Sequence, residues 1–184
     1  MRKLLLVRGD LAAGKSFFAD ILSQRYGANV FHKDSLKEVL GDTIGFTNRE
    51  ENQKLSRAAI ELMRFLFAES AKLDKDLILE SNFHKEEMER LYELAAKSQY
   101  EVLILELRGN PEILHKRFLN RIAKENRHPV HLTVKLDKFE DFKRCIESAR
   151  AEEICGDVLE INADDFSYQT DATVLARIDE FMGL

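Results

Sequence analysis

The sequence has 184 residues, of which 45% are hydrophobic and 33% are charged, so it is long enough for one domain with a substantial core. No apolar run approaches the roughly 20 residues that a membrane-spanning helix needs, and we therefore expect no membrane partner. The formal net charge of −5 argues against general binding to nucleic acid, which requires a basic surface, although it leaves room for a local basic pocket.

Two cysteines and the first residues bear on where the protein resides. Cys145 and Cys155 have neither the spacing of metal ligands nor that of a Cys-x-x-Cys pair, so we expect reduced thiols. Residues 1–3 resemble the basic start of an export signal, but the apolar run that follows ends at Val7 and is broken by Arg8. These features predict a cytoplasmic protein.

Short apolar runs alternate with amphipathic segments along the chain. The runs predict five strands, at residues 3–7, 29–32, 76–80, 101–107 and 158–161. Periodicity and capping signals predict helices at residues 15–25, 35–40, 47–73, 85–98, 110–124, 139–153 and 171–182. Residues 41–46 indicate a loop, and residues 127–137 an irregular excursion. This alternation predicts a single α/β domain over residues 1–184, in which helices cover both faces of a parallel sheet.

The loop after the first predicted strand carries the strongest motif. Residues 9–16, GDLAAGKS, fit the pattern G-x-x-x-x-G-K-[ST] at every fixed position, and a strand and a helix flank them as the pattern requires. The two glycines allow backbone N–H groups to converge on phosphate oxygens, beside the positive end of the following helix. Lys15 would contact the outer phosphates, and the Ser16 hydroxyl would bind Mg²⁺. The residues expected to surround the phosphates are Gly9, Asp10, Leu11, Ala12, Ala13, Gly14, Lys15, Ser16 and Phe17.

Asp34 follows the second predicted strand and should lie at the same edge of the sheet as this loop, because the carboxyl ends of parallel strands meet there. An ionised carboxylate at this place could take a proton from an acceptor hydroxyl or help to hold Mg²⁺. The alternative is that Asp34 only caps the helix that begins at residue 35. Lys37, one turn further on, could contact an acidic group of the acceptor, although an ordinary surface lysine fits equally well.

Glu80 ends the third predicted strand, where phosphate-loop proteins often place a carboxylate that acts on the metal or its waters. Asn82 and His84 follow in the same loop. We expect Glu80 and Asn82 to lie near the acceptor, and the choice between acceptor and metal stays open for Glu80. The alternative is that these are plain turn residues.

Arg117 and Arg121 lie four residues apart on one face of a predicted helix, and Arg127 follows just beyond it. A mobile cationic flap can neutralise the charge that develops during phosphoryl transfer and can exclude water. We therefore predict a lid at about residues 115–138, with Arg127 near the acceptor. A solvated face paired with acidic residues is the alternative.

The loop at residues 9–16, the segment KDSLK at residues 33–37, the strand that ends at Glu80 and the two helical arginines together resemble a known family. They are similar to the small phosphate-loop kinases of the zeta-toxin, chloramphenicol-phosphotransferase and polynucleotide-kinase group, often labelled AAA-type ATP-binding domains. The resemblance covers nearly the whole chain. It implies a three-layer P-loop NTPase fold whose five-stranded parallel sheet follows the nucleoside-monophosphate-kinase style. It also implies ATP and Mg²⁺ as ligands, and transfer of the γ-phosphoryl group to a hydroxyl.

The same resemblance implies a role for each matching residue. Lys15 and its loop would bind the phosphates of ATP, and Ser16 and Asp34 would bind Mg²⁺. Asp34 would also be the catalytic base, and the two helical arginines would act from the lid. Asn162, in the loop after the fifth strand, would border the adenine.

Three departures from the family pattern are visible. The phosphate loop has fewer Gly and Pro residues than is usual and carries the acidic Asp10. Glu80 stands where many relatives have Asp, and Lys37 stands where polynucleotide kinases often have Arg. Because a lysine cannot grip a phosphate bidentately, Lys37 weakens the nucleic-acid interpretation.

Several functions compete on these grounds. Our first expectation is an ATP- and Mg²⁺-dependent kinase that acts on a small hydroxylated acceptor. A polynucleotide 5′-hydroxyl kinase would instead show a basic channel leading to Asp34, and a nucleotide-binding regulatory protein would lack transfer. A GTPase switch is disfavoured, because the DTIG motif at residues 42–45 has no strand before it and the sequence has no Asn-Lys-x-Asp motif.

Overall fold

The computed structural model describes residues 1–133 and 135–184. At its centre lies a sheet of five parallel strands in the order β2-β3-β1-β4-β5. The strands are β1 (Arg2–Gly9), β2 (Asn29–His32), β3 (Leu77–Glu80), β4 (Tyr100–Arg108) and β5 (Asp157–Asn162). This topology confirms the predicted α/β fold with five parallel strands.

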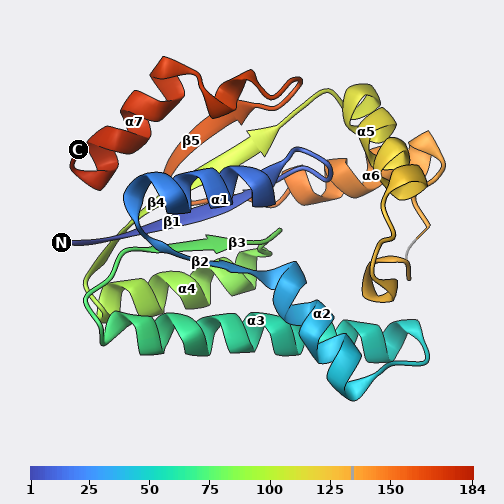
Figure 1. Cartoon of the computed structure of the whole chain (residues 1–184), viewed down its shortest axis with the longest axis horizontal. Helices are drawn as coiled ribbons and strands as arrows, with labels where there is room; N and C mark the ends of the chain where they lie inside the picture. The colour runs from blue at the N-terminus through green and yellow to red at the C-terminus, as the bar shows by residue number, and fades with distance from the viewer. Residues whose placement is uncertain (134) are drawn as a thin grey trace.

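Helices cover both faces of the sheet and give the molecule three layers (Figure 1). One face carries α1 (Lys15–Tyr26) and α7 (Ala172–Met182), and the other carries α3 (Arg49–Ala71) and α4 (Lys85–Lys97). Toward the carboxyl ends of the strands lie α2 (Lys33–Ile44), α5 (Pro111–Lys124), α6 (Phe139–Arg150) and the short turns η1 (Pro129–His131) and η2 (Ser167–Gln169). None of the helices in the described part of the chain is long and apolar enough to cross a membrane.

The residues of β1 alternate between two cores. Leu5 and Val7 belong to the core under α1 and α7, whereas Leu4 and Leu6 belong to the core under α3 and α4, and all four are fully buried. Burial on both faces is typical of parallel strands, and it explains why β1 is a continuous apolar run in the sequence. Because Val7 pairs with Glu80, the ends of β1 and β3 meet at the edge that carries the phosphate loop.

The second helix is longer than its sequence predicts. It spans Lys33–Ile44 rather than residues 35–40, so the loop expected at residues 41–46 is wrong as far as residue 44. Gly41 would ordinarily weaken a helix interior. Here a β-carbon added to Gly41 would lie 2.4 Å from the Val130 Cγ1, so the glycine leaves the space in which η1 packs. This long-range contact accounts for a helical glycine that local propensity does not favour.

Candidate active site

The phosphate loop joins the end of β1 to the start of α1, and its two glycines are needed for different reasons. Gly9 has a φ of 126°, and a β-carbon there would lie 2.1 Å from the Leu107 carbonyl oxygen of β4. Gly14 has a φ of 89°, and a β-carbon there would lie 2.6 Å from the Tyr168 Oη. The first glycine therefore permits close backbone approach to the sheet, and the second permits packing of η2 against the loop.

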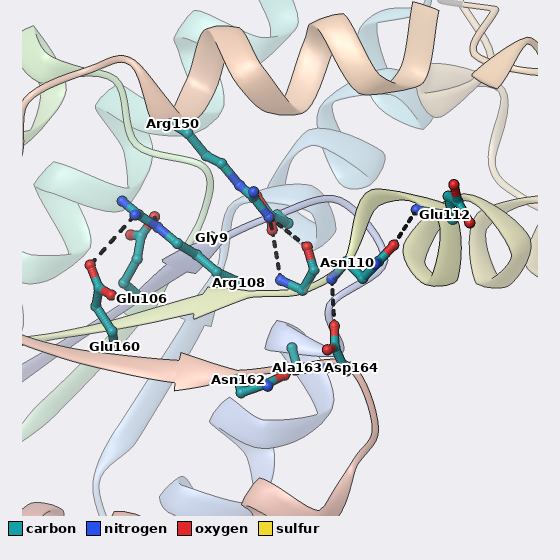
Figure 2. Close-up of polar contacts among 12 residues, drawn as sticks. Gly9, Glu106, Arg108, Asn110, Glu112, Arg150, Glu160, Asn162, Ala163 and Asp164 are labelled. Atoms are coloured by element: carbon teal, nitrogen blue, oxygen red, sulfur yellow. Dashed lines mark hydrogen bonds and ion pairs between the residues drawn. The ribbon is translucent and has the colours of Figure 1, made fainter. Parts of the chain in front are cut away.

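The side chain of Asp10 holds this loop from behind. Its carboxylate is buried, accepts a hydrogen bond from the Gly109 N–H at 2.9 Å, and accepts another from the Arg150 Nε at 3.1 Å. Figure 2 shows Arg150 reaching from α6 toward these strand ends beside Gly9. The pKa of Arg150 is raised mainly by its hydrogen bond to Asp10. The Asp10 carboxylate therefore shapes the loop and is bound by Arg150, which leaves the prediction for its backbone N–H group unchanged.

Lys15 lies within the curl of the loop. Its Nζ donates to the carbonyl oxygens of Asp10 at 2.7 Å and Gly9 at 3.1 Å. Burial lowers the pKa of Lys15, and the nearby carboxylates of Glu80 and Asp34 act in the opposite direction. The ammonium is therefore held where backbone N–H groups of such a loop converge, with two carboxylates close enough to favour its charge.

Ser16 and Glu80 form a pair of hard oxygen ligands at the start of α1. The Ser16 hydroxyl donates to the Glu80 Oε2 at 3.0 Å, and the Glu80 side chain is buried at the end of β3. Residues 1–133 and 135–184 contain no group of three or more His, Cys, Asp or Glu residues that could hold a metal ion by themselves. A hydroxyl with one carboxylate nevertheless fits Mg²⁺, which usually takes its other ligands from phosphates and water.

The His32 imidazole extends this pair. Its Nδ1 lies 3.0 Å from the Glu80 Oε2, and its Nε2 lies 2.9 Å from the Asp20 Oδ1 on α1. The pKa of His32 is raised mainly by its hydrogen bond to Glu80 and secondarily by Asp20, against the opposing effect of burial. Glu80 therefore contacts Ser16 and His32 through Oε2, and it is not among the residues that line the cavity described next.

A cavity of about 790 Å³ opens in front of Ser16. Asp34 lines it from the first turn of α2, with a side chain that is 56% exposed. His32 rather than Asp34 is the N-cap residue of α2, so the interpretation of Asp34 as a mere helix cap is wrong. The Asp34 carboxylate is consequently free of capping and faces the same cavity as Ser16.

Two arginines also line the cavity. Arg121 and Arg127 line it, at the end of α5 and in the segment that follows. Burial lowers the pKa of Arg127, and the neighbouring charge of Arg121 lowers it further. The Arg121 Nε also lies 3.3 Å from the Glu125 Oε2. Two cations placed close together in this way favour an anion between them.

Arg117, expected beside them in the lid, is held elsewhere. Its guanidinium donates to the carbonyl oxygens of Ala163, at 2.6 Å, and Asp164, and lies 4.3 Å from the ring centroid of Phe166. As a correction, the structure brings Arg117 to the loop after β5 rather than into the cavity, because these carbonyls use its donors.

Asn162 shapes that loop from within. Its Oδ1 accepts a hydrogen bond from the Asp164 N–H at 2.8 Å, and Asp164 in turn accepts from the Asn110 N–H (Figure 2). Phe17, the last of the residues expected around the phosphates, is 62% exposed at the start of α1. The loop expected to border a nucleotide base is therefore tied both to α5 and to the end of β4.

Lys37 and Asn82, two of the expected acceptor-binding residues, do not line the cavity. Lys37 is buried, and its Nζ donates to the Asn52 Oδ1 at 2.7 Å and to the Val130 carbonyl at 3.1 Å. Asn82 lines a smaller hollow beside Arg8 and Glu106. As a correction, Lys37 fastens η1 to α2, and Asn82 lies on a different side of the strand ends.

Sequence reasoning missed several residues of the site. Asp20, His32, Glu38 and His131 line the cavity, and the His131 Nε2 lies 2.7 Å from the Glu38 Oε1. The two histidines of the irregular segment were a usable signal. The packing of Tyr168 against the phosphate loop had none, because a single tyrosine between a strand and a helix has no distinctive pattern.

This strand order, with a glycine-bounded loop after β1 and a carboxylate at the end of β3, is that of a P-loop NTPase fold. A family model described as an AAA domain matches residues 4–148, and the chain belongs to that family. No curated protein matches the chain significantly.

Solved structures share the fold at low sequence identity. A protein from Chloroflexus aurantiacus, provisionally described as a kinase, has a TM-score of 0.82 at 24% identity, and the match covers 97% of each chain. Shikimate kinase from Bacteroides thetaiotaomicron has a TM-score of 0.58 at 18% identity, with 99% of each chain covered. A gluconokinase from Sinorhizobium meliloti has a TM-score of 0.57 at 15% identity, covering 98% of this chain and 96% of its own.

Proposed function

We propose that the protein is an ATP- and Mg²⁺-dependent kinase that transfers the γ-phosphoryl group to a hydroxyl of a small acceptor. One observation carries the proposal: Ser16 of the phosphate loop, Asp34, Arg121 and Arg127 all line one cavity. Family membership and the P-loop kinase fold support it. The finer resemblance to the zeta-toxin group stays part of this proposal.

Each group has a definite task in that reaction. The backbone N–H groups of the loop and the Lys15 ammonium bind the phosphates of ATP. Ser16 and Glu80 would hold Mg²⁺, in place of the expected pair of Ser16 and Asp34, because their oxygens lie 3.0 Å apart; the bound metal would neutralise charge on the phosphates of ATP. Asp34 would accept the proton of the acceptor hydroxyl as that oxygen attacks the γ-phosphorus, while the bond from that phosphorus to the bridging oxygen breaks and ADP leaves. Arg121 and Arg127 stabilise the negative charge that is spread over the transferred group.

The purine would lie beside the loop after β5. Arg117 and Phe166 stack there at 4.3 Å, and the Tyr168 Oη donates to the Ala13 carbonyl at 2.8 Å. The Phe166 ring, 49% exposed, offers a flat face against which a base could stack. Asn162 then has the indirect role of holding the loop rather than that of a base contact.

The segment η1 and the mixed charges that line the cavity favour a small acceptor over a polynucleotide. The Val130 carbonyl accepts from the Lys37 Nζ and from the Asn52 Nδ2, the latter at 3.0 Å, so that η1 is docked on α2 and α3. The cavity walls mix Asp34 and Glu38 with the two arginines instead of presenting a uniformly basic channel. Two proteins of the same fold are named shikimate kinase and gluconokinase, for small hydroxylated acceptors.

The test is a screen of acceptors with γ-labelled ATP, in which the native chain is compared with Asp34→Asn. Loss of the base should lower transfer at least about 100-fold while nucleotide affinity is retained. Asp74→Asn is the matched control, because Asp74 is 89% exposed in the loop between α3 and β3. Equal transfer by the native chain and Asp34→Asn would exclude Asp34 as the base.

The same screen separates the alternatives. Transfer to the 5′-hydroxyl of an oligonucleotide, and to no small molecule, would favour the polynucleotide kinase. ATP binding without transfer to any acceptor would favour a nucleotide-binding regulatory protein.

A further inference from the structure

A chain of four polar side chains connects the phosphate loop to the outer surface of α1. It runs from the Ser16 hydroxyl to the Glu80 carboxylate, then through the His32 ring to the Asp20 carboxylate. Each link is between 2.9 and 3.0 Å long. The sequence motifs account for the serine and the glutamate, and no motif accounts for the histidine or for Asp20.

The fold places these groups with little freedom. His32 and Glu80 are paired residues at the ends of the adjacent parallel strands β2 and β3. The His32 side chain is 17% exposed and that of Glu80 is 7% exposed, so both are largely removed from water. Ser16 and Asp20 lie four residues apart on α1 and therefore share one face of that helix. Two strands and one helix thus fix the whole chain of contacts.

Both donors use the same oxygen of Glu80. The Ser16 hydroxyl and the His32 Nδ1 each lie 3.0 Å from Oε2. Across residues 1–133 and 135–184, Oε1 receives no hydrogen bond. The carboxylate is therefore pinned through one oxygen while the other is left available beside the Ser16 hydroxyl.

We propose that His32 is a positioning residue for the divalent cation, and that Asp20 orients the His32 ring. The proposal rests on the proposed function, because it assigns a task to neighbours of the Ser16 and Glu80 pair. A carboxylate that is held in one rotamer presents its oxygen without further ordering when the metal arrives. Asp20 supplies a second acceptor on the far side of the ring, which fixes the plane of the imidazole as outer partners of metal sites do.

Two amide substitutions separate the two contacts of the ring. His32→Asn places an amide nitrogen near the position of Nδ1, so the hydrogen bond to Glu80 is retained and the one to Asp20 is lost. His32→Gln places its amide near the position of Nε2, so the contact with Asp20 is retained and Glu80 is released. His84→Gln is a matched control, because His84 pairs with Glu152 at 2.7 Å and is 70% exposed.

The measurement is calorimetric affinity for adenylyl imidodiphosphate with and without Mg²⁺, together with direct binding of Mn²⁺ followed by electron paramagnetic resonance. His32→Gln should lose about ten-fold of the affinity gained from Mg²⁺, and His32→Asn should lose little of it. Asp20→Asn should fall between them. Metal-free nucleotide affinity and the melting temperature should stay close to the native values in each variant.

The outcomes distinguish the inference from the proposed function. A native chain that fails to bind the nucleotide analogue overturns the proposed function and the inference with it. Mg²⁺-dependent binding by the native chain that is unchanged in His32→Gln overturns the inference alone. Equal losses in His32→Gln and His32→Asn, or a parallel loss of metal-free affinity, would show that His32 only joins the strands and also overturn it.

Discussion

The two walls of the cavity are built in contrasting ways. On the nucleotide side, residues 9–16 are held by contacts with several elements. Gly9 packs closely against β4, the Asp10 carboxylate bonds to Arg150 of α6, and Tyr168 of η2 donates to the loop. On the side of the proposed lid, the Val130 carbonyl of η1 accepts hydrogen bonds from α2 and α3, and two histidines pair with carboxylates of α2, His131 with Glu38 and His128 with Asp42. The first wall is fixed by buried backbone and side-chain contacts, whereas the second is held by Val130 and by histidine pairs with carboxylates that are 42% and 74% exposed.

This contrast matches the demands of phosphoryl transfer. A phosphate loop binds best when its N–H groups are already in place, because preorganised donors stabilise charge without rearrangement. A lid must open to admit the acceptor and close to exclude water, so it belongs among the less strongly held parts of the fold. The difference predicts that substitutions in residues 9–16 affect folding and nucleotide binding, whereas substitutions at the Gly41–Val130 contact, the seat of the proposed lid, affect mainly that lid.

The largest expected effect is that of Gly9→Ala. Its new β-carbon would meet the Leu107 backbone, with the carbonyl oxygen at 2.1 Å, and neither strand can move away without breaking the sheet. We expect the free energy of unfolding to fall by about 3 kcal/mol or more, measured by urea denaturation.

Gly27→Ala is the control for this change. Gly27 has a φ of 63° and no atom within 4 Å of the position of an added β-carbon, so only the left-handed backbone is unfavourable. A loss of about 1 kcal/mol is expected for it. If the two variants lost the same amount, close approach to β4 would not be what makes Gly9 necessary.

Lys15→Ala should come next in size. Removing the ammonium takes away a charged donor to the phosphates, which corresponds to about 2 kcal/mol, or roughly a 30-fold rise in the dissociation constant of ATP. Isothermal titration calorimetry measures it, with the exposed Lys54→Ala as control. An unchanged dissociation constant would contradict the nucleotide site.

The smallest effect should be seen at the seat of the lid, in Gly41→Ala. An alanine would ordinarily favour the helix by up to about 1 kcal/mol, but its β-carbon would lie 2.4 Å from the Val130 Cγ1. We expect η1 to be displaced, with amide hydrogen exchange over residues 128–132 rising about ten-fold, equivalent to about 1.4 kcal/mol.

A second substitution sharpens that prediction. In the double variant with Val130→Ala, the clash is removed, and exchange should return toward the native rate. Unchanged exchange in Gly41→Ala, or additive effects in the double variant, would show that Val130 is not the seat of the lid.

Local sequence was sufficient for the strands and for the phosphate loop. Continuous apolar runs predict parallel strands that are buried on both faces. The motif at residues 9–16 includes the two glycines and the lysine that form the phosphate loop. Local sequence was insufficient for Lys37 and Arg117. Their positions on helices near the site predict a contact with the acceptor for Lys37 and a place in the lid for Arg117. In the fold, the carbonyl oxygens of Val130 and Ala163, which lie far away in the sequence, accept hydrogen bonds from Lys37 and Arg117 respectively.

By itself, then, the sequence determined the α/β class, the parallel sheet, the place of the phosphate loop and the edge at which Asp34 would stand. Only the tertiary structure decided which polar groups are already bonded within the protein, such as Asp10 with Arg150 and the Oε2 of Glu80 with Ser16 and His32. The physical reason is that periodicity and motifs report local geometry. Whether a charged side chain already forms a hydrogen bond or ion pair within the protein depends on segments far away in the chain.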